Sequence, residues 1–227
     1  MEPTLITFSG IDGAGKSTQI DKLRRYLSEQ GIPVETLTFW DNVAVLASLR
    51  SGFSRRVLES DGQVGTPERP ANRNDKNRQS LPLLLGRSLL HLLDVFRLRR
   101  IVRRAKSASP SRGVIIFDRY IYDQLAALPL AHWLARSFAS LILKLAPQPD
   151  LSFLLDAVPE EARARKPEYP LEFLRVYRDS YLELGRMVRL SFVSAAGADE
   201  VHAAILERWK KLAGESAEMP VQSAVAA

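Results

Sequence analysis

Residues 10–17 read Gly-Ile-Asp-Gly-Ala-Gly-Lys-Ser and match the pattern G-x-x-x-x-G-K-[ST] in full. The preceding residues 4–8 are β-branched and apolar, as in a buried strand. The following residues 18–30 carry apolar side chains at helical spacing. Strand, glycine-rich loop and helix in this order are the setting of a phosphate-binding loop, whereas a chance glycine turn would not need both neighbours. The chain is therefore predicted to begin as an α/β fold organised around bound phosphate.

The residue types of this loop explain how it would hold an anion. Its glycines allow the backbone to curl tightly, and backbone N–H groups at the start of the helix then point at the phosphates. Lys16 is predicted to reach the β- and γ-phosphates of a nucleotide, and the Ser17 hydroxyl to bind Mg²⁺.

Strands alternate with helices along the rest of the chain. We predict strands at 4–8, 33–39, 113–118, 150–156 and 192–195, with helices at 18–30, 43–58, 81–105, 171–190 and 199–212. This order predicts an α/β three-layer P-loop sandwich, in which a five-stranded parallel sheet carries helices on both faces. A single domain would span residues 1–213, with a mobile loop at 60–80 and a disordered tail at 214–227.

Composition narrows the class of protein. The chain has no cysteine, which excludes disulfide partners, thiolate metal sites and cysteine nucleophiles. No signal peptide is visible at the N-terminus, so we expect a cytoplasmic enzyme supplied with ATP. The net charge of +6 is concentrated at 97–112, which holds seven Lys or Arg and no acid. Contact with nucleic acid or an anionic membrane is one interpretation. We favour a solvated helix end, because no aromatic residue interleaves with the charges.

A second motif, Asp118-Arg119-Tyr120, ends the third predicted strand. Ligands bind beyond the carboxyl ends of strands in an open parallel sheet. Asp118 could hold Mg²⁺ through its waters or accept a hydroxyl proton there, and Arg119 could clamp a transferring phosphoryl group. The alternative is an ordinary ion pair at a strand end. The position downstream of a phosphate-binding loop favours the functional interpretation.

Together these motifs resemble the thymidylate kinase family of nucleoside monophosphate kinases. The resemblance covers residues 4–212, and its specific parts are the loop at 8–19 and the triplet at 118–120. It implies transfer of the γ-phosphoryl group of ATP to a nucleotide-like acceptor, formally dTMP to dTDP, with Mg²⁺ as cofactor. It also implies a homodimer formed through helices. The leucine-rich helix at 81–102 is the candidate interface, because its apolar residues nearly surround the axis.

The resemblance assigns roles to particular residues. The implied ATP-binding residues are Gly10, Asp12, Gly13, Ala14, Gly15, Lys16, Ser17 and Thr18. The resemblance places Asp12 toward the acceptor, and Trp40, Arg87 and Tyr120 could line the acceptor pocket, while Ser17 and Asp118 are the candidate Mg²⁺ ligands. Gly13 stands where some members carry an arginine, so a lid at 159–170 is expected to supply the missing cation. The implied catalytic residues are Lys16, Asp118, Arg119 and the lid residues Arg163 and Arg165, with Lys166 beside them. A basic turn before the next helix is the alternative for the lid cations.

The acceptor half departs from the family pattern. Trp40-Asp41-Asn42 replaces an Arg-Glu-Pro-Gly-Gly-Thr-like segment, and Leu83 replaces the aromatic residue that precedes Arg87. We therefore expect thymidylate to be a poor substrate. Two alternatives stay open: a nucleoside kinase, which needs no phosphate-binding arginine, and a nucleotide-binding regulatory protein without transfer activity. For Trp40 and His91, packing in the core or an interface is the preferred interpretation.

Overall fold

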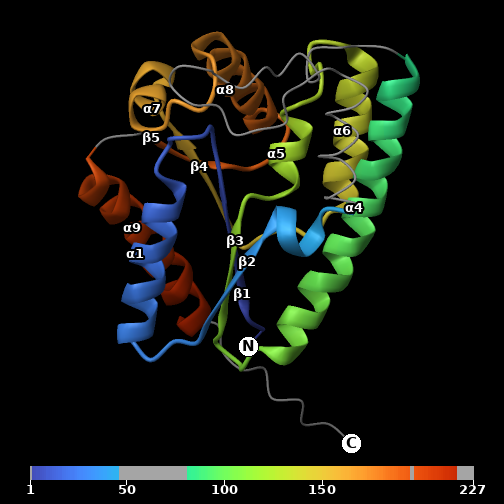
Figure 1. Ribbon diagram of the computed structural model, residues 1–227. Coiled ribbons are helices and arrows are strands. Elements are labelled where there is room, and N and C mark those ends of the chain that lie inside the picture. The colour runs from blue at the N-terminus through green and yellow to red at the C-terminus, as the bar shows by residue number, and fades with distance from the viewer. Residues whose placement is uncertain (1, 46–80, 195–196, 219–227) are drawn as a thin grey trace, which may run out of the picture.

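The computed structural model of the chain describes residues 2–45, 81–194 and 197–218. They form an all-parallel, five-stranded sheet with the order β2-β3-β1-β4-β5 (Figure 1). The strands are β1 (Thr4–Ser9), β2 (Val34–Thr38), β3 (Val114–Asp118), β4 (Leu151–Asp156) and β5 (Ser191–Ser194). The predicted sheet is confirmed, and each strand boundary lies within one residue of its expected position.

Helices cover both faces of the sheet, as expected for a three-layer sandwich. On one face α1 (Lys16–Glu29) packs against α9 (Ala198–Glu218), and on the other α4 (Leu81–Ala108) packs against α6 (Trp133–Leu145) (Figure 1). The remaining helices are η1 (Phe39–Val43), α5 (Ile121–Leu125), α7 (Pro159–Arg165) and α8 (Leu171–Gly185). None of the helices in the described ranges is both long enough and apolar enough to cross a membrane.

The central strands position the site by their register. Because helices cover both faces, five of the six residues of β1 are buried, and the strand reads as a nearly continuous apolar run. Phe8 lies opposite Asp118 of β3 and Phe153 of β4, and the rings of Phe8 and Phe153 stack with centroids 5.2 Å apart. β1 and β3 therefore end side by side, which brings the loops that follow them together at the carboxyl edge of the sheet.

Four predicted segments differ from the structure or lie outside it. The helix expected at 171–190 ends at Gly185 as α8. The helix expected at 43–58 is preceded by the π-helix η1, while residues 46–58 and the loop at 60–80 lie outside the described residues. The last helix continues to Glu218, so residues 214–218 are helical and the tail prediction is wrong there. Alanine and glutamate are strong helix formers, which explains the continuation. Residues 219–227 lie outside the described ranges.

Candidate active site

The phosphate-binding loop joins β1 to α1 at the carboxyl edge of the sheet. Lys16, the first residue of α1, folds back over the loop, and its Nζ donates hydrogen bonds to the carbonyl oxygens of Gly10 (2.8 Å) and Ile11 (2.9 Å). Burial, together with the positive charge of Arg119, lowers the pKa of Lys16 to about 8. The side chain predicted to bind phosphates is thus already held at the loop by backbone carbonyls. Ser17 is exposed at the start of the helix.

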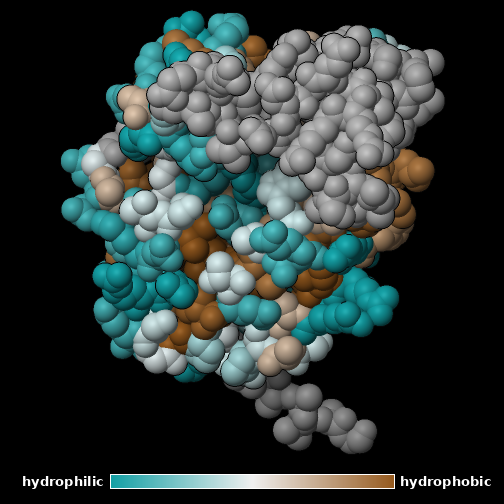
Figure 2. Space-filling view, viewed as in Figure 1, coloured by the Kyte–Doolittle hydropathy of each residue, from teal (hydrophilic) through white to brown (hydrophobic). Residues whose placement is uncertain are grey.

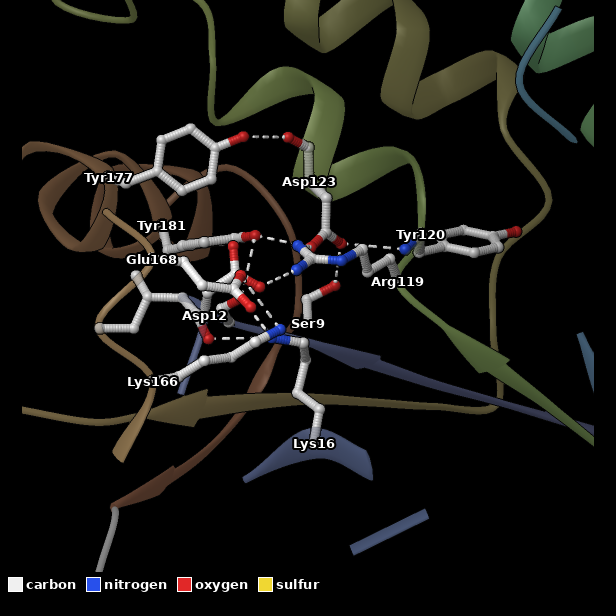
Figure 3. Close-up of polar contacts among 12 residues, drawn as sticks. Ser9, Asp12, Lys16, Arg119, Tyr120, Asp123, Lys166, Glu168, Tyr177 and Tyr181 are labelled. Carbon is white, nitrogen blue, oxygen red and sulfur yellow. Dashed lines mark hydrogen bonds and ion pairs between the residues drawn. The ribbon is translucent and has the colours of Figure 1, made fainter. Parts of the chain in front are cut away.

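Arg119 lies beside this loop, held between two carboxylates (Figure 3). Its guanidinium forms an ion pair with Asp12 of the loop and lies 3.1 Å from Oδ1 of Asp123 in α5. Burial alone would lower the pKa of Arg119, but the charges of Asp123 and Asp12 raise it above its usual range. The residue has a left-handed backbone with φ of 64°, a conformation that costs a non-glycine residue on the order of 1 kcal/mol. Arg119 is therefore a fixed cation next to the phosphate-binding loop.

Asp123 is the buried acceptor that organises this side of the site. Its Oδ2 accepts hydrogen bonds from Ser9 Oγ (2.7 Å) and from the backbone N–H of Tyr120 (2.9 Å). Its Oδ1 accepts from Arg119 and from the Tyr181 hydroxyl (2.7 Å). A buried carboxylate is tolerated when its charge is paired and its oxygens are hydrogen-bonded, and both conditions hold here.

Two tyrosines of α8 complete the network. Tyr181 donates to the Asp123 side chain, and the Tyr177 hydroxyl donates to the Asp123 carbonyl oxygen at 2.7 Å. Burial raises the pKa of both tyrosines, so they are neutral donors at physiological pH. Ser9, Asp123, Tyr177 and Tyr181 were not predicted from the sequence. The available signal was spacing. Tyr177 and Tyr181 lie four residues apart, which puts both on one face of α8. Asp123 follows Arg119 by four residues, across the turn that leads into α5.

Asp118 ends β3 at the same edge. Its Oδ1 is buried and has no hydrogen-bond partner among the described residues, and burial raises the pKa of the carboxyl. An unpartnered carboxylate oxygen and the exposed Ser17 hydroxyl are hard oxygen ligands of the kind that Mg²⁺ prefers. The two predicted metal ligands therefore have the right donor chemistry.

Helix α7, which lies in the predicted lid segment, packs directly on the phosphate-binding loop. Gly13 has φ of 84°, and a Cβ there would lie 2.1 Å from the carbonyl oxygen of Ala162. The missing side chain at residue 13 is what lets α7 approach. Arg163, the next residue, has a buried Nε with no partner within the described ranges. Arg165 is turned toward Glu161 of its own helix.

A further cation of the predicted lid segment lies next to the loop. Lys166 forms an ion pair of 3.2 Å with Glu168, and Figure 3 shows both side chains beside Asp12. Lys166 can therefore contribute positive charge at the same edge of the sheet as Lys16.

The acceptor candidates are only partly brought to the site. Trp40 lies in η1 and is 42% exposed, so it is not packed in the core, and its place in an interface stays a prediction. The polar residues after it bind Thr38: Asp41 Oδ2 accepts from the Thr38 hydroxyl (2.6 Å), and Asn42 Oδ1 accepts from its backbone N–H (2.8 Å). His91 is buried against Phe138, which confirms the packing interpretation for His91.

Tyr120 requires a correction. Its side chain is fully buried, and its hydroxyl donates to the Pro147 carbonyl oxygen at 2.8 Å, pointing away from Arg119 (Figure 3). The prediction that Tyr120 contacts the acceptor through its ring is wrong, because the turn into α5 sends the ring into the core against Phe117 and Tyr122. The Arg87 side chain lies outside the described residues.

Comparison with known proteins gives a consistent result, although no family model matches the chain. The chain is 30% identical to the thymidylate kinase of Chlorobium luteolum over 91% of its own length and 99% of that protein. It is 31% identical to the thymidylate kinase of Chlorobaculum parvum, over 83% and 80% of the two chains. The solved thymidylate kinase of Candida albicans superposes with a TM-score of 0.60 over 99% of this chain and 97% of that one, at 18% identity. This last likeness shows a shared fold.

Proposed function

The chain belongs to the thymidylate kinase family, and from this premise we propose that it transfers the γ-phosphoryl group of ATP to thymidylate. As a member it is a P-loop nucleotide kinase, a phosphotransferase. The observation that supports this reaction best is the pairing of Arg119 with Asp12 of the phosphate-binding loop, directly beside Lys16. Two cations from the segments that follow β1 and β3 thus converge where phosphates would bind.

In the proposed reaction, an oxygen of the acceptor phosphate attacks the γ-phosphorus of ATP while the bond to the ADP oxygen breaks. Lys16 would exchange its carbonyl partners Gly10 and Ile11 for the β- and γ-phosphates. Arg119 would contact the transferring group, and Arg163 and Arg165 would approach it from the lid. Catalysis of this kind consists of positioning and charge stabilisation.

Mg²⁺ fits the oxygen donors at this edge. The Ser17 hydroxyl and the Asp118 carboxylate, whose Oδ1 has no partner in the described part of the chain, would hold it. When bound, the ion would neutralise charge on the nucleotide phosphates. A cytoplasmic location, expected from the need for ATP, is part of the same proposal.

Fewer described residues are available to bind the acceptor than to bind ATP. Asp12 and Trp40 are the acceptor candidates at this edge, and Asp41 and Asn42 are engaged with Thr38. The segment at 40–42 carries no cation, so we expect a high KM for thymidylate. Family membership favours a nucleoside monophosphate over a nucleoside acceptor, and a transferase over a regulatory protein.

The test is ADP formation with thymidylate, with thymidine and without acceptor, in wild type and in Lys16→Ala. We expect thymidylate-dependent ADP formation that the variant loses, with kcat/KM below about 10⁴ M⁻¹s⁻¹ because the segment at 40–42 carries no arginine for the acceptor phosphate. Turnover that depends on thymidine would support the nucleoside kinase instead. Nucleotide binding without any turnover would support the regulatory protein.

We also propose a homodimer formed through α4. Leu89, Leu93 and Phe96 repeat at helical spacing and are 59%, 42% and 58% exposed. The neighbouring α6 adds exposed Leu134 and Leu141. Figure 2 shows hydrophobic residues along the right-hand margin of the molecule, where Figure 1 places α4. A second copy of the chain would cover this stripe.

A further inference from the structure

A pocket lies at the opposite end of β1 from the phosphate-binding loop. It measures about 540 Å³ and lies between the C-terminal half of α4, the start of β1 and the segment that joins α6 to β4. Figure 1 shows the chain start and the end of α4 together, far from α7 and α8. The phosphate-binding loop begins at Gly10, and at about 3.3 Å per strand residue it lies roughly 20 Å from Pro3 in the pocket wall. The pocket is thus separate from the active site.

Helical spacing divides the basic run at 97–112 into two stripes. Arg99, Arg103 and Lys106 recur at intervals of four and three residues and line the pocket. Arg100 and Arg104 lie on the same helix but outside the lining. The pocket therefore receives one stripe of the basic run rather than the whole of it.

The pocket cations are largely uncompensated. Lys144 reaches the same hollow from α6, which makes four cations around it. Lys106 pairs with Glu2 at 3.2 Å. Within the described ranges, no carboxylate pairs with Arg99, Arg103 or Lys144. Like charges gathered around one hollow repel each other, and an anion bound between them would relieve that repulsion.

The shape of the pocket narrows the class of ligand. Buried Leu5 and Val102 and the neighbouring Pro147 give it an apolar wall. Its volume lies in the range of small-molecule sites, roughly 300–1,000 Å³. No aromatic side chain is among its lining residues, and single-stranded nucleic acids need aromatic rings for stacking. A concave site also suits a compact ligand better than a flat membrane surface.

We propose that this pocket binds a small anion with two or more linked phosphate groups, either free polyphosphate or the phosphate chain of a nucleotide. Arg99 and Arg103 would hold the phosphates through charge-assisted hydrogen bonds, for which a guanidinium is well shaped. Lys144 would add a third charge from the opposite wall.

The test is calorimetric titration with inorganic tripolyphosphate, compared between two double variants. Wild type should show two sites, one in the phosphate-binding loop and one in the pocket. Arg99→Ala with Arg103→Ala should weaken the second site at least about tenfold and leave the first unchanged. The matched control, Arg100→Ala with Arg104→Ala, removes the same charge from the same helix and should keep both sites. Hydrogen exchange should show protection at 99–107 and 144–148.

Several outcomes would overturn the proposal. Equal weakening in both double variants would indicate diffuse attraction to the basic helix. A single wild-type site that Lys16→Ala abolishes would leave only the phosphate-binding loop. Binding to anionic vesicles that requires Arg99 and Arg103, without tripolyphosphate binding, would assign them to a membrane. Two further outcomes would support the proposal and identify the source of the phosphates. Tighter binding of a nucleoside triphosphate than of tripolyphosphate would indicate a nucleotide, and equal affinity would indicate free polyphosphate.

Discussion

The lowered pKa of Lys16 predicts how ATP binding depends on pH. Since the pKa is about 8 in the free protein, the side chain is mostly charged at pH 7 and mostly neutral at pH 9. Phosphates need the charged form, so the affinity for ATP should fall by about tenfold between these pH values. Equilibrium titration at constant ionic strength would measure it. Lys16→Met should bind ATP weakly and without this fall, and a wild-type affinity that is constant up to pH 9 would contradict the prediction.

Asp123→Asn should separate the positioning of Arg119 from ATP binding. The variant keeps the shape of the side chain but removes its negative charge. That charge holds Arg119 and strengthens the hydrogen bond that Oδ1 accepts from the Tyr181 hydroxyl. We expect kcat to fall by about tenfold to a hundredfold, and the free energy of unfolding by about 3 kcal/mol. The dissociation constant of ATP should change little. Single-turnover kinetics and direct ATP titration would measure the two effects.

The control for this variant is Asp156→Asn. Asp156 also pairs with an arginine, Arg178, at 2.6 and 2.8 Å, but neither residue forms a hydrogen bond or ion pair with Arg119 in the described part of the chain. The Asp156→Asn variant should be less stable than wild type, with kcat unchanged. If both variants lower kcat equally, Asp123 stabilises the fold and has no specific role in placing Arg119.

At the residue scale, the sequence predicted the parts that follow local motifs. Lys16, Asp118 and Arg119 could be proposed from the sequence because each stands at the end of a strand or loop that its own neighbours define. Asp123 and Tyr181 were missed because they act across elements, and their partnership exists only once α8 packs beside α5. Tyr120 was assigned to the acceptor because a triplet shows no side-chain direction.

At the scale of elements, the contact between α7 and the phosphate-binding loop gives a sharp test. Gly13→Ala would place a Cβ 2.1 Å from the Ala162 carbonyl oxygen, and this would displace α7. We expect kcat to fall at least about tenfold, since small misplacements of catalytic groups are costly. Stability should fall as well, because φ is 84°. Steady-state kinetics and thermal unfolding would measure both effects.

Gly31→Ala is the matched control. Gly31 also has a left-handed backbone, with φ of 70°, but no atom lies within 4 Å of a Cβ built there. It should lose about 1 kcal/mol of stability and keep full activity. Full activity in Gly13→Ala would show that the contact of α7 with the loop is dispensable.

The strands were predictable because each is a short apolar run bounded by turn residues, and only their ends shifted. Segments whose structure depends on side-chain bonds were harder to predict. The turn of η1 is stabilised by hydrogen bonds from Thr38 to the side chains of Asp41 and Asn42. A pattern of hydrophobic residues does not reveal such bonds. The contact between α7 and Gly13 could not be predicted either, because the sequence shows only that residue 13 lacks a side chain.

At the scale of the whole molecule, the apolar stripe of α4 predicts a dimer. Leu93→Glu with Phe96→Glu should convert the protein to a monomer at micromolar concentration, because two charges would enter the centre of the interface. Light scattering would measure the mass. Val176→Glu, at a 50% exposed position on α8, is the control and should stay dimeric. A wild-type monomer would contradict the proposed interface.

The three layers were predictable from alternating strands and helices, but the order of the strands within the sheet was not. β1 comes first in the chain and lies third in the sheet, an order that long-range pairing decides. The pocket beside Arg99 and Arg103 was hidden for the same reason, since one wall comes from residues 144–148.

The central position of β1 also affects the protein while it is being made. Thr4 pairs with Val114, and Ile6 pairs with Leu151, so both neighbours of the first strand are translated long after it. At about 5–20 residues per second, roughly 5–20 s pass on the ribosome before β3 follows β1. During that time an apolar strand has no partner, and the loop after it cannot close around a nucleotide. The first strand of the nascent chain thus stays exposed at both edges until the middle third of the sequence has been translated.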